Sequence, residues 1–218
     1  MLVVNFYGAP GAGKSTASSG LYHEMKKHWI EAEYIQEYAK ELVWSGSSHM
    51  LSQQNYIFAK QEHRLNRLLS KVQVAISDSP LLLSSFYAPK TYPQSFHRLV
   101  FDFFHNYPNV NIFVKRSHEY SARGRVQNVS EADFISDEMQ KFLRNNKIPF
   151  YIITANDASP KRILSWLLSS GKIEKPEHIP FSEETLPPNW LLDETPHEMW
   201  DQNSVVIPAN LEGIKTVG

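Results

Sequence analysis

Short hydrophobic runs alternate along the chain with segments in which hydrophobic residues recur every three to four positions. The short runs have the length and apolar character of buried strands, which are expected at residues 2–7, 33–36, 72–78, 109–115 and 148–154. Between them, the spacing of Leu21, Met25 and Trp29 is typical of a helix. Helices are expected at residues 15–29, 37–44, 53–69, 81–87, 94–105, 130–145 and 159–170.

This alternation of strands and helices predicts an α/β fold, a doubly wound parallel sheet with helices on both faces. Ser130-Glu131-Ala132-Asp133 has the shape of a capping box with Asp in place of Glu, and it predicts the start of one helix. Gly171 predicts the end of the last helix. Residues 88–93 contain two prolines, which forbid a regular helix, and this break is a candidate wall of a ligand cleft.

The first strand runs directly into a glycine-rich segment that satisfies the pattern G-x-x-x-x-G-K-[ST]. Glycines let the backbone turn tightly and point successive N–H groups at one position, where the dipole of the following helix favours an anion. We predict that this loop binds the phosphates of ATP through Gly8, Gly11, Ala12, Gly13, Lys14, Ser15 and Thr16. Lys14 is expected to reach the β- and γ-phosphates, and the Ser15 hydroxyl to bind Mg²⁺.

Two acidic residues follow strands that are expected to lie near this loop. Asp78 ends the apolar run 72–78, which is the Walker-B arrangement, and it is predicted to hold Mg²⁺ together with Ser15. Glu37 follows the second strand, and ligands of open parallel sheets bind beyond the carboxyl ends of the strands. The alternatives are a turn-forming Asp and a solvated surface Glu.

Three arginines follow the fourth strand within ten residues, around a glycine: Arg116, Arg123 and Arg125. Arginine supplies planar, bidentate donors where charge spreads during phosphoryl transfer, so this segment is predicted to be a lid, or else ordinary surface. The polar face of the helix at 53–69 carries Gln53, Gln54, Tyr56, Lys60, Arg64 and Arg67. That face either contacts a ligand or is simply solvated.

Composition narrows the class of protein. A chain of 218 residues with 42% hydrophobic residues suits one well-buried domain with a small appendage. No apolar run approaches the roughly 20 residues of a membrane span, and the apolar start lacks the charged region of a signal peptide. The absence of cysteine excludes disulfides, thiolate zinc sites and a cysteine nucleophile. A cytoplasmic protein without a membrane partner is expected.

Charge is unevenly distributed. Residues 1–174 hold 20 Lys and Arg against 15 Asp and Glu, whereas residues 175–218 hold 2 against 8 and also contain 6 of the 13 prolines. We therefore predict a domain at 1–174 and an acidic, proline-rich arm at 175–218. Because Trp190 and Trp200 supply apolar area, the arm is expected to pack on the domain, as a brace or beside the site.

These segments together resemble the P-loop nucleoside and nucleotide kinases over residues 2–170. The segments that carry the resemblance are 8–16, Glu37-Tyr38-Ala39-Lys40-Glu41, 53–56, Ser77-Asp78-Ser79-Pro80 and 116–125. The nearest likeness is to the nicotinamide-riboside kinase domain of bacterial NAD-biosynthesis regulators and to related small phage P-loop proteins. The break at 89–93 and the acidic arm depart from that pattern, so the acceptor is open to differ from nicotinamide riboside.

The resemblance implies a P-loop NTPase fold of three layers, with a five-stranded parallel sheet in the order 2-3-1-4-5. It implies that Lys14 and Ser15 serve ATP and Mg²⁺, and that Asp78 serves the metal or the acceptor hydroxyl. Glu37 would face the acceptor. Arg123 and Arg125 would face the phosphates, with Arg116 beside the nucleotide.

Three functions are consistent with these features. The first is a Mg-ATP-dependent kinase that phosphorylates a hydroxyl of a nucleoside, a nucleotide or a nicotinamide-riboside-like small acceptor. The second is a kinase for a hydroxyl of modified DNA or a nucleic-acid end, which the net charge of +5 over residues 1–174 favours and the lack of a long basic stripe weakens. The third is an ATPase switch without an acceptor.

Overall fold

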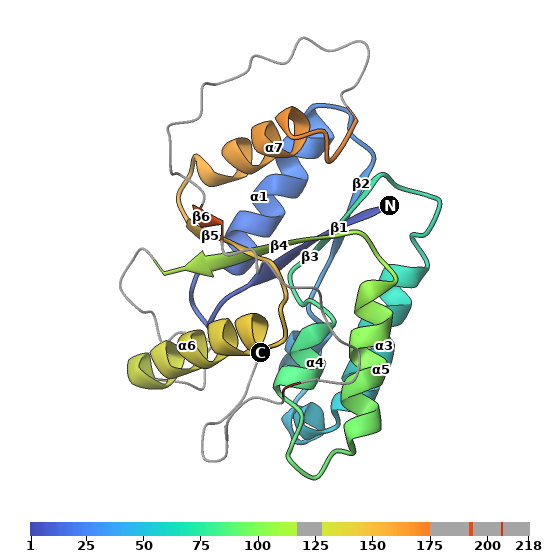
Figure 1. Ribbon diagram of the computed structural model, residues 1–218, viewed down its shortest axis with the longest axis vertical. Coiled ribbons are helices and arrows are strands. Elements are labelled where there is room, and N and C mark those ends of the chain that lie inside the picture. The colour runs from blue at the N-terminus through green and yellow to red at the C-terminus, as the bar shows by residue number, and fades with distance from the viewer. Residues whose placement is uncertain (117–127, 175–191, 194–205, 207–218) are drawn as a thin grey trace.

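The computed structural model describes residues 1–116, 128–174, 192–193 and 206. Within these residues one sheet has six strands: β1 (Leu2–Tyr7), β2 (Ala32–Ile35), β3 (Val74–Ser77), β4 (Asn109–Lys115), β5 (Tyr151–Thr154) and β6 (Leu192–Asp193). Their order is β2-β3-β1-β4-β5-β6 (Figure 1). The first five strands are parallel, which confirms the predicted sheet and its order 2-3-1-4-5. The sheet has the α/β architecture of a P-loop NTPase.

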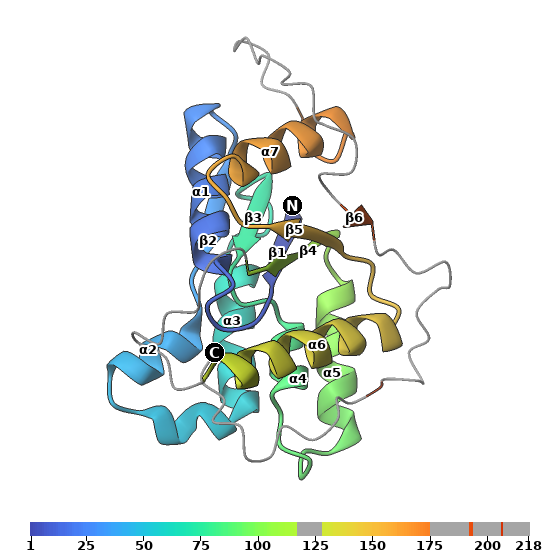
Figure 2. The same cartoon turned by 90° about the vertical axis from the view of Figure 1, so that its left-hand side faces the viewer.

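The helices cover both faces of the sheet. They are α1 (Lys14–Lys27), α2 (Tyr38–Trp44), α3 (Gln54–Asn66), α4 (Leu82–Phe86), α5 (Gln94–His105), α6 (Val129–Asn145) and α7 (Ser159–Ser169). Helices α1 and α7 pack on one face, and α3 to α6 pack on the other (Figures 1 and 2). Successive side chains of β1 alternate between the two layers, as a strand requires: Val4 and Phe6 face α1 and α7, and Val3 and Tyr7 face α3 to α6.

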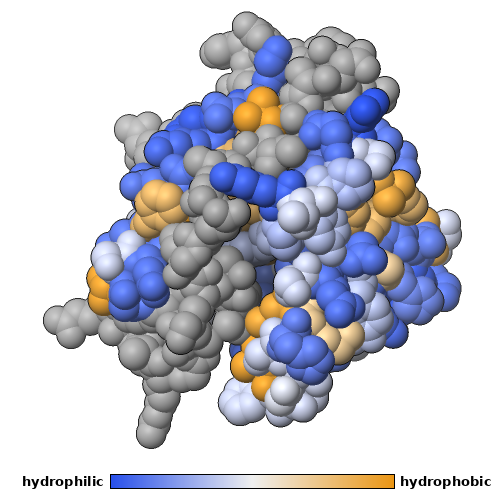
Figure 3. All heavy atoms as spheres, turned by 90° about the horizontal axis from the view of Figure 1, so that it is seen from below, coloured by the Kyte–Doolittle hydropathy of each residue, from blue (hydrophilic) through white to orange (hydrophobic). Residues whose placement is uncertain are grey.

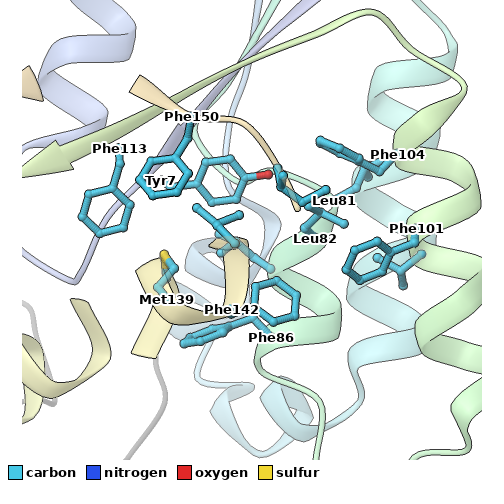
Figure 4. Close-up of a cluster of buried hydrophobic side chains, with 14 of the residues drawn as sticks. Tyr7, Leu81, Leu82, Phe86, Phe101, Phe104, Phe113, Met139, Phe142 and Phe150 are labelled. Carbon is cyan, nitrogen blue, oxygen red and sulfur yellow. The ribbon is translucent and has the colours of Figure 1, made fainter. Parts of the chain in front are cut away.

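The larger of the two cores contains many aromatic side chains (Figure 4). Tyr7 of β1 and Phe113 of β4 meet Phe150, Met139 of α6, and residues of α4 and α5 in this core. Each fully buried phenylalanine of this kind contributes about 2–3 kcal/mol to folding. The core thereby fixes the carboxyl ends of the central strands, where the predicted site residues lie.

Helix α6 begins with a different capping box from the predicted one. The Asn128 side chain accepts a 2.9 Å hydrogen bond from the Glu131 N–H, and the Glu131 carboxylate accepts a 2.7 Å bond from the Asn128 N–H. The prediction of a box at Ser130 and Asp133 is therefore wrong by two residues. The physical reason is that the Asp133 carboxylate is paired with Arg116 instead.

Two short elements were absent from the sequence interpretation. One is the 3-10 helix η1 (Ser48–Ser52), between α2 and α3, and the other is β6, which pairs antiparallel with β5. The described residues 192–193 of the predicted arm thus form a strand, and at Val206 the arm's backbone exchanges hydrogen bonds of 2.7 and 2.8 Å with the buried Asn146 side chain. Trp190 and Trp200 lie outside the described residues.

On the face seen in Figure 3, the described surface is mostly hydrophilic, and exposed hydrophobic side chains form small, separate patches. In the part of the chain that the structure describes, no helix has the length and apolar character needed to cross a membrane.

Candidate active site

The glycine-rich loop joins β1 to α1 in the conformation that its sequence predicts. Gly8, Gly11 and Gly13 have φ values of 144°, 79° and 94°, which other residues rarely adopt. A Cβ atom on Gly8 would also lie 2.7 Å from the Val114 carbonyl oxygen, so this position has room only for glycine. No described side chain caps the N-terminus of α1. The loop therefore fits an anion held by backbone N–H groups.

Lys14 lies over this loop. Its ammonium donates hydrogen bonds of 2.8 Å to the Gly8 carbonyl oxygen and 3.2 Å to the Ala9 carbonyl oxygen. Within the loop, the Ala12 side chain is buried, so this residue can offer a phosphate only its backbone N–H. Thr16 is exposed on the first turn of α1. The structure thus places the one cation of the predicted loop where phosphates would bind.

Ser15 and Asp78 meet directly. The Ser15 hydroxyl donates a 2.6 Å hydrogen bond to Asp78 Oδ2. Asp78 is buried, and its second oxygen, Oδ1, has no hydrogen-bond partner among the described residues. A buried carboxylate oxygen without a partner is costly unless a ligand completes it.

These two residues fit Mg²⁺. They offer hydroxyl and carboxylate oxygens, which Mg²⁺ prefers, and Mg²⁺ at such sites is held by one or two protein groups together with phosphates and water. A site with three or more His, Cys, Asp or Glu residues does not occur among the described residues. The donor set at Ser15 and Asp78 is therefore the one that a nucleotide-bound Mg²⁺ requires.

Tyr34 also contacts Asp78, a contact that sequence reasoning missed. The Tyr34 hydroxyl, on β2, donates a 3.1 Å hydrogen bond to Asp78 Oδ2. Burial, followed by the Asp78 charge, raises the pKa of Tyr34, so the hydroxyl stays protonated and remains a donor. Only the pairing of β2 with β3 brings these residues together, and no local pattern announces it.

Glu37 lies between β2 and α2, near Lys14 and Asp78. Burial raises the pKa of Glu37 to about 7; the Asp78 charge adds to this, while the Lys14 and Lys40 charges partly oppose it. The carboxyl group therefore changes protonation in the range where a general base works best. The structure brings together Lys14, Ser15, Glu37 and Asp78, which the sequence had placed at the ends of three separate strands.

A small cavity of about 20 Å³ adjoins Glu37. Its lining comes from α2, η1, α3, α4 and the residues that flank α2 and α4, and consists of Glu37, Ala39, Leu51, Gln54, Ile57, Ser79, Leu83, Ser84 and Tyr87. Burial, and then the Glu37 charge, raises the pKa of Tyr87. Lys and Arg are absent from this set of described lining residues. A cavity of this size holds one water molecule, so a larger ligand needs the walls to part.

The polar face of α3 divides between this cavity and other contacts. Gln54 lines the cavity, whereas Arg64 forms a 2.7 Å ion pair with Glu41 and Lys60 lies over the Tyr56 ring. The predicted wall at residues 88–93 contacts η1 and α3: the single hydrogen of the Tyr92 hydroxyl is directed to Asn55 Oδ1 at 2.9 Å and to the Ser52 carbonyl oxygen at 3.3 Å. That segment supports η1 and α3 and does not line the cavity.

Arg116 stands at the other side of the loop. It pairs with Asp133 and lines a hollow of about 340 Å³ between the loop and α6. Arg123 and Arg125, the remaining arginines of the predicted lid, lie outside the described residues.

Comparison with known proteins gives a family match. A family model described as an AAA domain matches residues 3–161. A search of curated proteins found no match. A solved structure of deoxyadenosine kinase from M. mycoides with the products dCMP and dCDP has 16% identity and a TM-score of 0.46, over 77% of this chain and 99% of that chain. The structure of that kinase with bound dCTP has 18% identity and a TM-score of 0.46, over 76% of this chain and 98% of that chain.

Proposed function

The chain belongs to the AAA-domain family whose model matches residues 3–161, and from this premise we propose that it is a Mg-ATP-dependent kinase for a hydroxyl group of a small, nucleoside-like acceptor. The observation that carries the proposal is the position of Glu37. It borders both the phosphate loop and a cavity, and its pKa is raised to about 7.

The phosphate side follows from the loop. Backbone N–H groups and Lys14 would hold the β- and γ-phosphates of ATP. Mg²⁺ bound with ATP at Ser15 and Asp78 would neutralise charge on the transferring group. The Ser15 oxygen would offer a lone pair to the metal while its hydrogen stays bonded to Asp78, and the Tyr34 hydrogen bond would help to keep the carboxylate in place.

The acceptor side follows from Glu37. As the acceptor oxygen forms its bond to the γ-phosphorus, the bond from that phosphorus to the ADP oxygen breaks, and the hydroxyl proton passes to the Glu37 carboxylate. The products are a phosphate ester and ADP. Asp78 is bonded to Ser15 and so has the better claim on Mg²⁺, which leaves Glu37 as the better candidate for the base.

Once the walls part to admit an acceptor, the side chains that line the cavity favour one acceptor class. A nucleotide acceptor brings a phosphate that needs a cation, yet the described lining contains apolar side chains, neutral polar groups and one acid. This lining supports a nucleoside whose ring is neutral or positively charged, as in nicotinamide riboside. It gives less support to a nucleoside monophosphate.

Incubation with ATP labelled at the γ-phosphate and a panel of acceptors tests the proposal. The panel contains nucleosides, nicotinamide riboside, nucleoside monophosphates and DNA. Label on a nucleoside-type hydroxyl is the expected result. Label on a monophosphate overturns the acceptor class, and label on DNA selects a polymer kinase. Release of free phosphate alone overturns the kinase assignment.

A further inference from the structure

The turn that carries Glu37 is held by a side chain from another helix. Gln61 of α3 is only 3% exposed, and its side-chain amide bonds to the peptide groups on both sides of Glu37. Its Oε1 accepts a 3.3 Å hydrogen bond from the Tyr38 N–H, and its Nε2 donates a 3.2 Å bond to the Gln36 carbonyl oxygen. The two hydrogen bonds of the Gln61 amide thus bracket Glu37, and we call this pair of bonds the bracket.

The two backbone groups that Gln61 contacts lie outside the regular hydrogen bonding of the strand and the helix. Strand β2 ends at Ile35, so the Gln36 carbonyl lies beyond it, and Tyr38 opens α2, where first-turn N–H groups lack helical partners. The N-cap residue Glu37 forms no side-chain capping hydrogen bond of its own. A primary amide has an oxygen that accepts and a nitrogen that donates, so it can serve both the Tyr38 N–H and the Gln36 carbonyl.

We propose that Gln61 is a positioning residue for Glu37, which holds the turn between β2 and α2 so that the carboxylate faces both the phosphate loop and the acceptor cavity. This inference rests on the proposed function. Arg64 contributes only to one side of the bracket: its guanidinium donates a 3.0 Å bond to the Gln36 carbonyl and is also paired with Glu41. Of these two side chains, only Gln61 reaches both sides.

Replacement of Gln61 by methionine tests this assignment, because methionine has a similar length but no hydrogen-bonding amide. Without the bracket the Glu37 turn relaxes, and a base misplaced by about 1 Å loses up to roughly 10²-fold in rate. We expect Gln61→Met to lower kcat about 10-fold or more while the ATP KM stays near the wild-type value. Because partial unfolding also lowers apparent kcat at an unchanged KM, kcat is expressed per folded protein, with the folded fraction taken from the stoichiometry of ATP binding in calorimetry.

A double-mutant cycle with Glu37→Gln identifies the route of the effect. If Gln61 acts through Glu37, then Gln61→Met causes no further fall in kcat once Glu37 is already Gln. The matched control is Ser85→Ala, which deletes a fully buried hydroxyl that forms a 2.9 Å hydrogen bond with His97. That control should lower stability and leave kcat unchanged.

Each result of the cycle has one meaning. Independent, multiplying effects of Gln61→Met and Glu37→Gln overturn the positioning role, as does a Gln61→Met variant with wild-type kcat, and both leave the proposed function standing. Wild-type kcat in Glu37→Gln overturns the proposed base and the positioning role together. If Gln61→Met does not fold, Gln61→Glu replaces it: this variant keeps an acceptor for the Tyr38 N–H but sets an acceptor against the Gln36 carbonyl, so the same loss of kcat is expected.

Discussion

The Ser15 hydroxyl donates a 2.6 Å hydrogen bond to Asp78, a residue 63 positions further along the chain. Parallel pairing of β1 with β3 sets Asn5 opposite Ser77, and so brings the loop after one strand to the acid after the other. The Asp78 oxygen that Ser15 does not contact is buried without a partner among the described residues. Under the proposed function, this oxygen is the group that a bound Mg²⁺ would engage.

Tyr34→Phe should weaken Mg²⁺ binding, because it removes a hydrogen bond that orients Asp78. A hydrogen bond to a charged group contributes about 1.5 kcal/mol or more, so we expect roughly a tenfold rise in the Mg²⁺ concentration needed for half-maximal activity. Binding of Mn²⁺ with ATP, followed by electron paramagnetic resonance, provides a reading that does not depend on turnover. Tyr22→Phe is the matched control, since the Tyr22 ring lies beside that of Tyr34. Unchanged Mn²⁺ affinity in Tyr34→Phe would remove Tyr34 from the site.

Lys14→Ala should abolish turnover. The substitution removes the cation that lies over the phosphate loop, where it now contacts the Gly8 and Ala9 carbonyl oxygens. Phosphoryl transfer depends on such charge neutralisation. The measurement is the steady-state rate at saturating ATP and acceptor. A rate equal to that of the wild type would show that this loop does not bind the reacting phosphates.

The pH dependence of the rate should follow Glu37. A general base must be ionised, and its pKa is raised to about 7, so kcat should rise with pH and reach half of its plateau near pH 7. A plateau that extends unchanged down to pH 5 would exclude Glu37 as the base.

The same pKa shift should make stability fall as pH rises, whereas it makes kcat rise. The folded-state pKa of Glu37 lies above its ordinary value of 4.5, so the folded protein binds more protons between about pH 4.5 and 7. The contribution of Glu37 to the free energy of unfolding therefore falls as pH rises through that window. In urea denaturation, the free energy of unfolding of Glu37→Gln minus that of the wild type should be more positive at pH 8 than at pH 5. An equal difference between the two proteins at both pH values would contradict the shift.

Truncation after Glu174 should lower Tm without changing the KM for ATP or acceptor. The described contacts of the arm are β6 on β5 and Val206 on Asn146, and none of these residues lines the acceptor cavity. The truncation is placed after Glu174 because Ile173 is buried in the core. Each lost hydrogen bond is worth about 1 kcal/mol, and each kcal/mol roughly 2–4 °C of Tm. A changed acceptor KM would instead make the arm part of the site, and an unaltered Tm would show that it does not brace the domain.

The sequence predicted those features that depend on neighbours along the chain. The phosphate loop needs glycines at set spacings, and a buried parallel strand needs an apolar run, so both can be predicted from local sequence. Asp78 could be predicted because it ends such an apolar run. The sheet order came from family resemblance, and the structure confirms it.

Other features depend on side chains that converge from separate elements. Tyr34 reaches Asp78 only because β2 pairs with β3, and Gln61 reaches the Glu37 turn only because α3 packs beneath it. Their residue types are ordinary for a strand and for a helix, so no pattern distinguishes them. The capping box was misplaced for a similar reason: Arg116 takes up Asp133, and local spacing cannot reveal that competition.

Glu37→Gln tests the central claim most directly, which is that this carboxylate accepts the proton of the acceptor hydroxyl. The amide keeps the shape of the side chain and cannot act as a base. Loss of a general base costs about 10²–10⁴ in rate, so we predict that kcat at saturating substrates falls about 10²-fold or more. ATP affinity, measured separately by calorimetry, should stay close to that of the wild type. A variant whose ATP affinity collapses while its rate at saturation is retained would contradict the account, because Glu37 would then serve the nucleotide and Asp78 the acceptor.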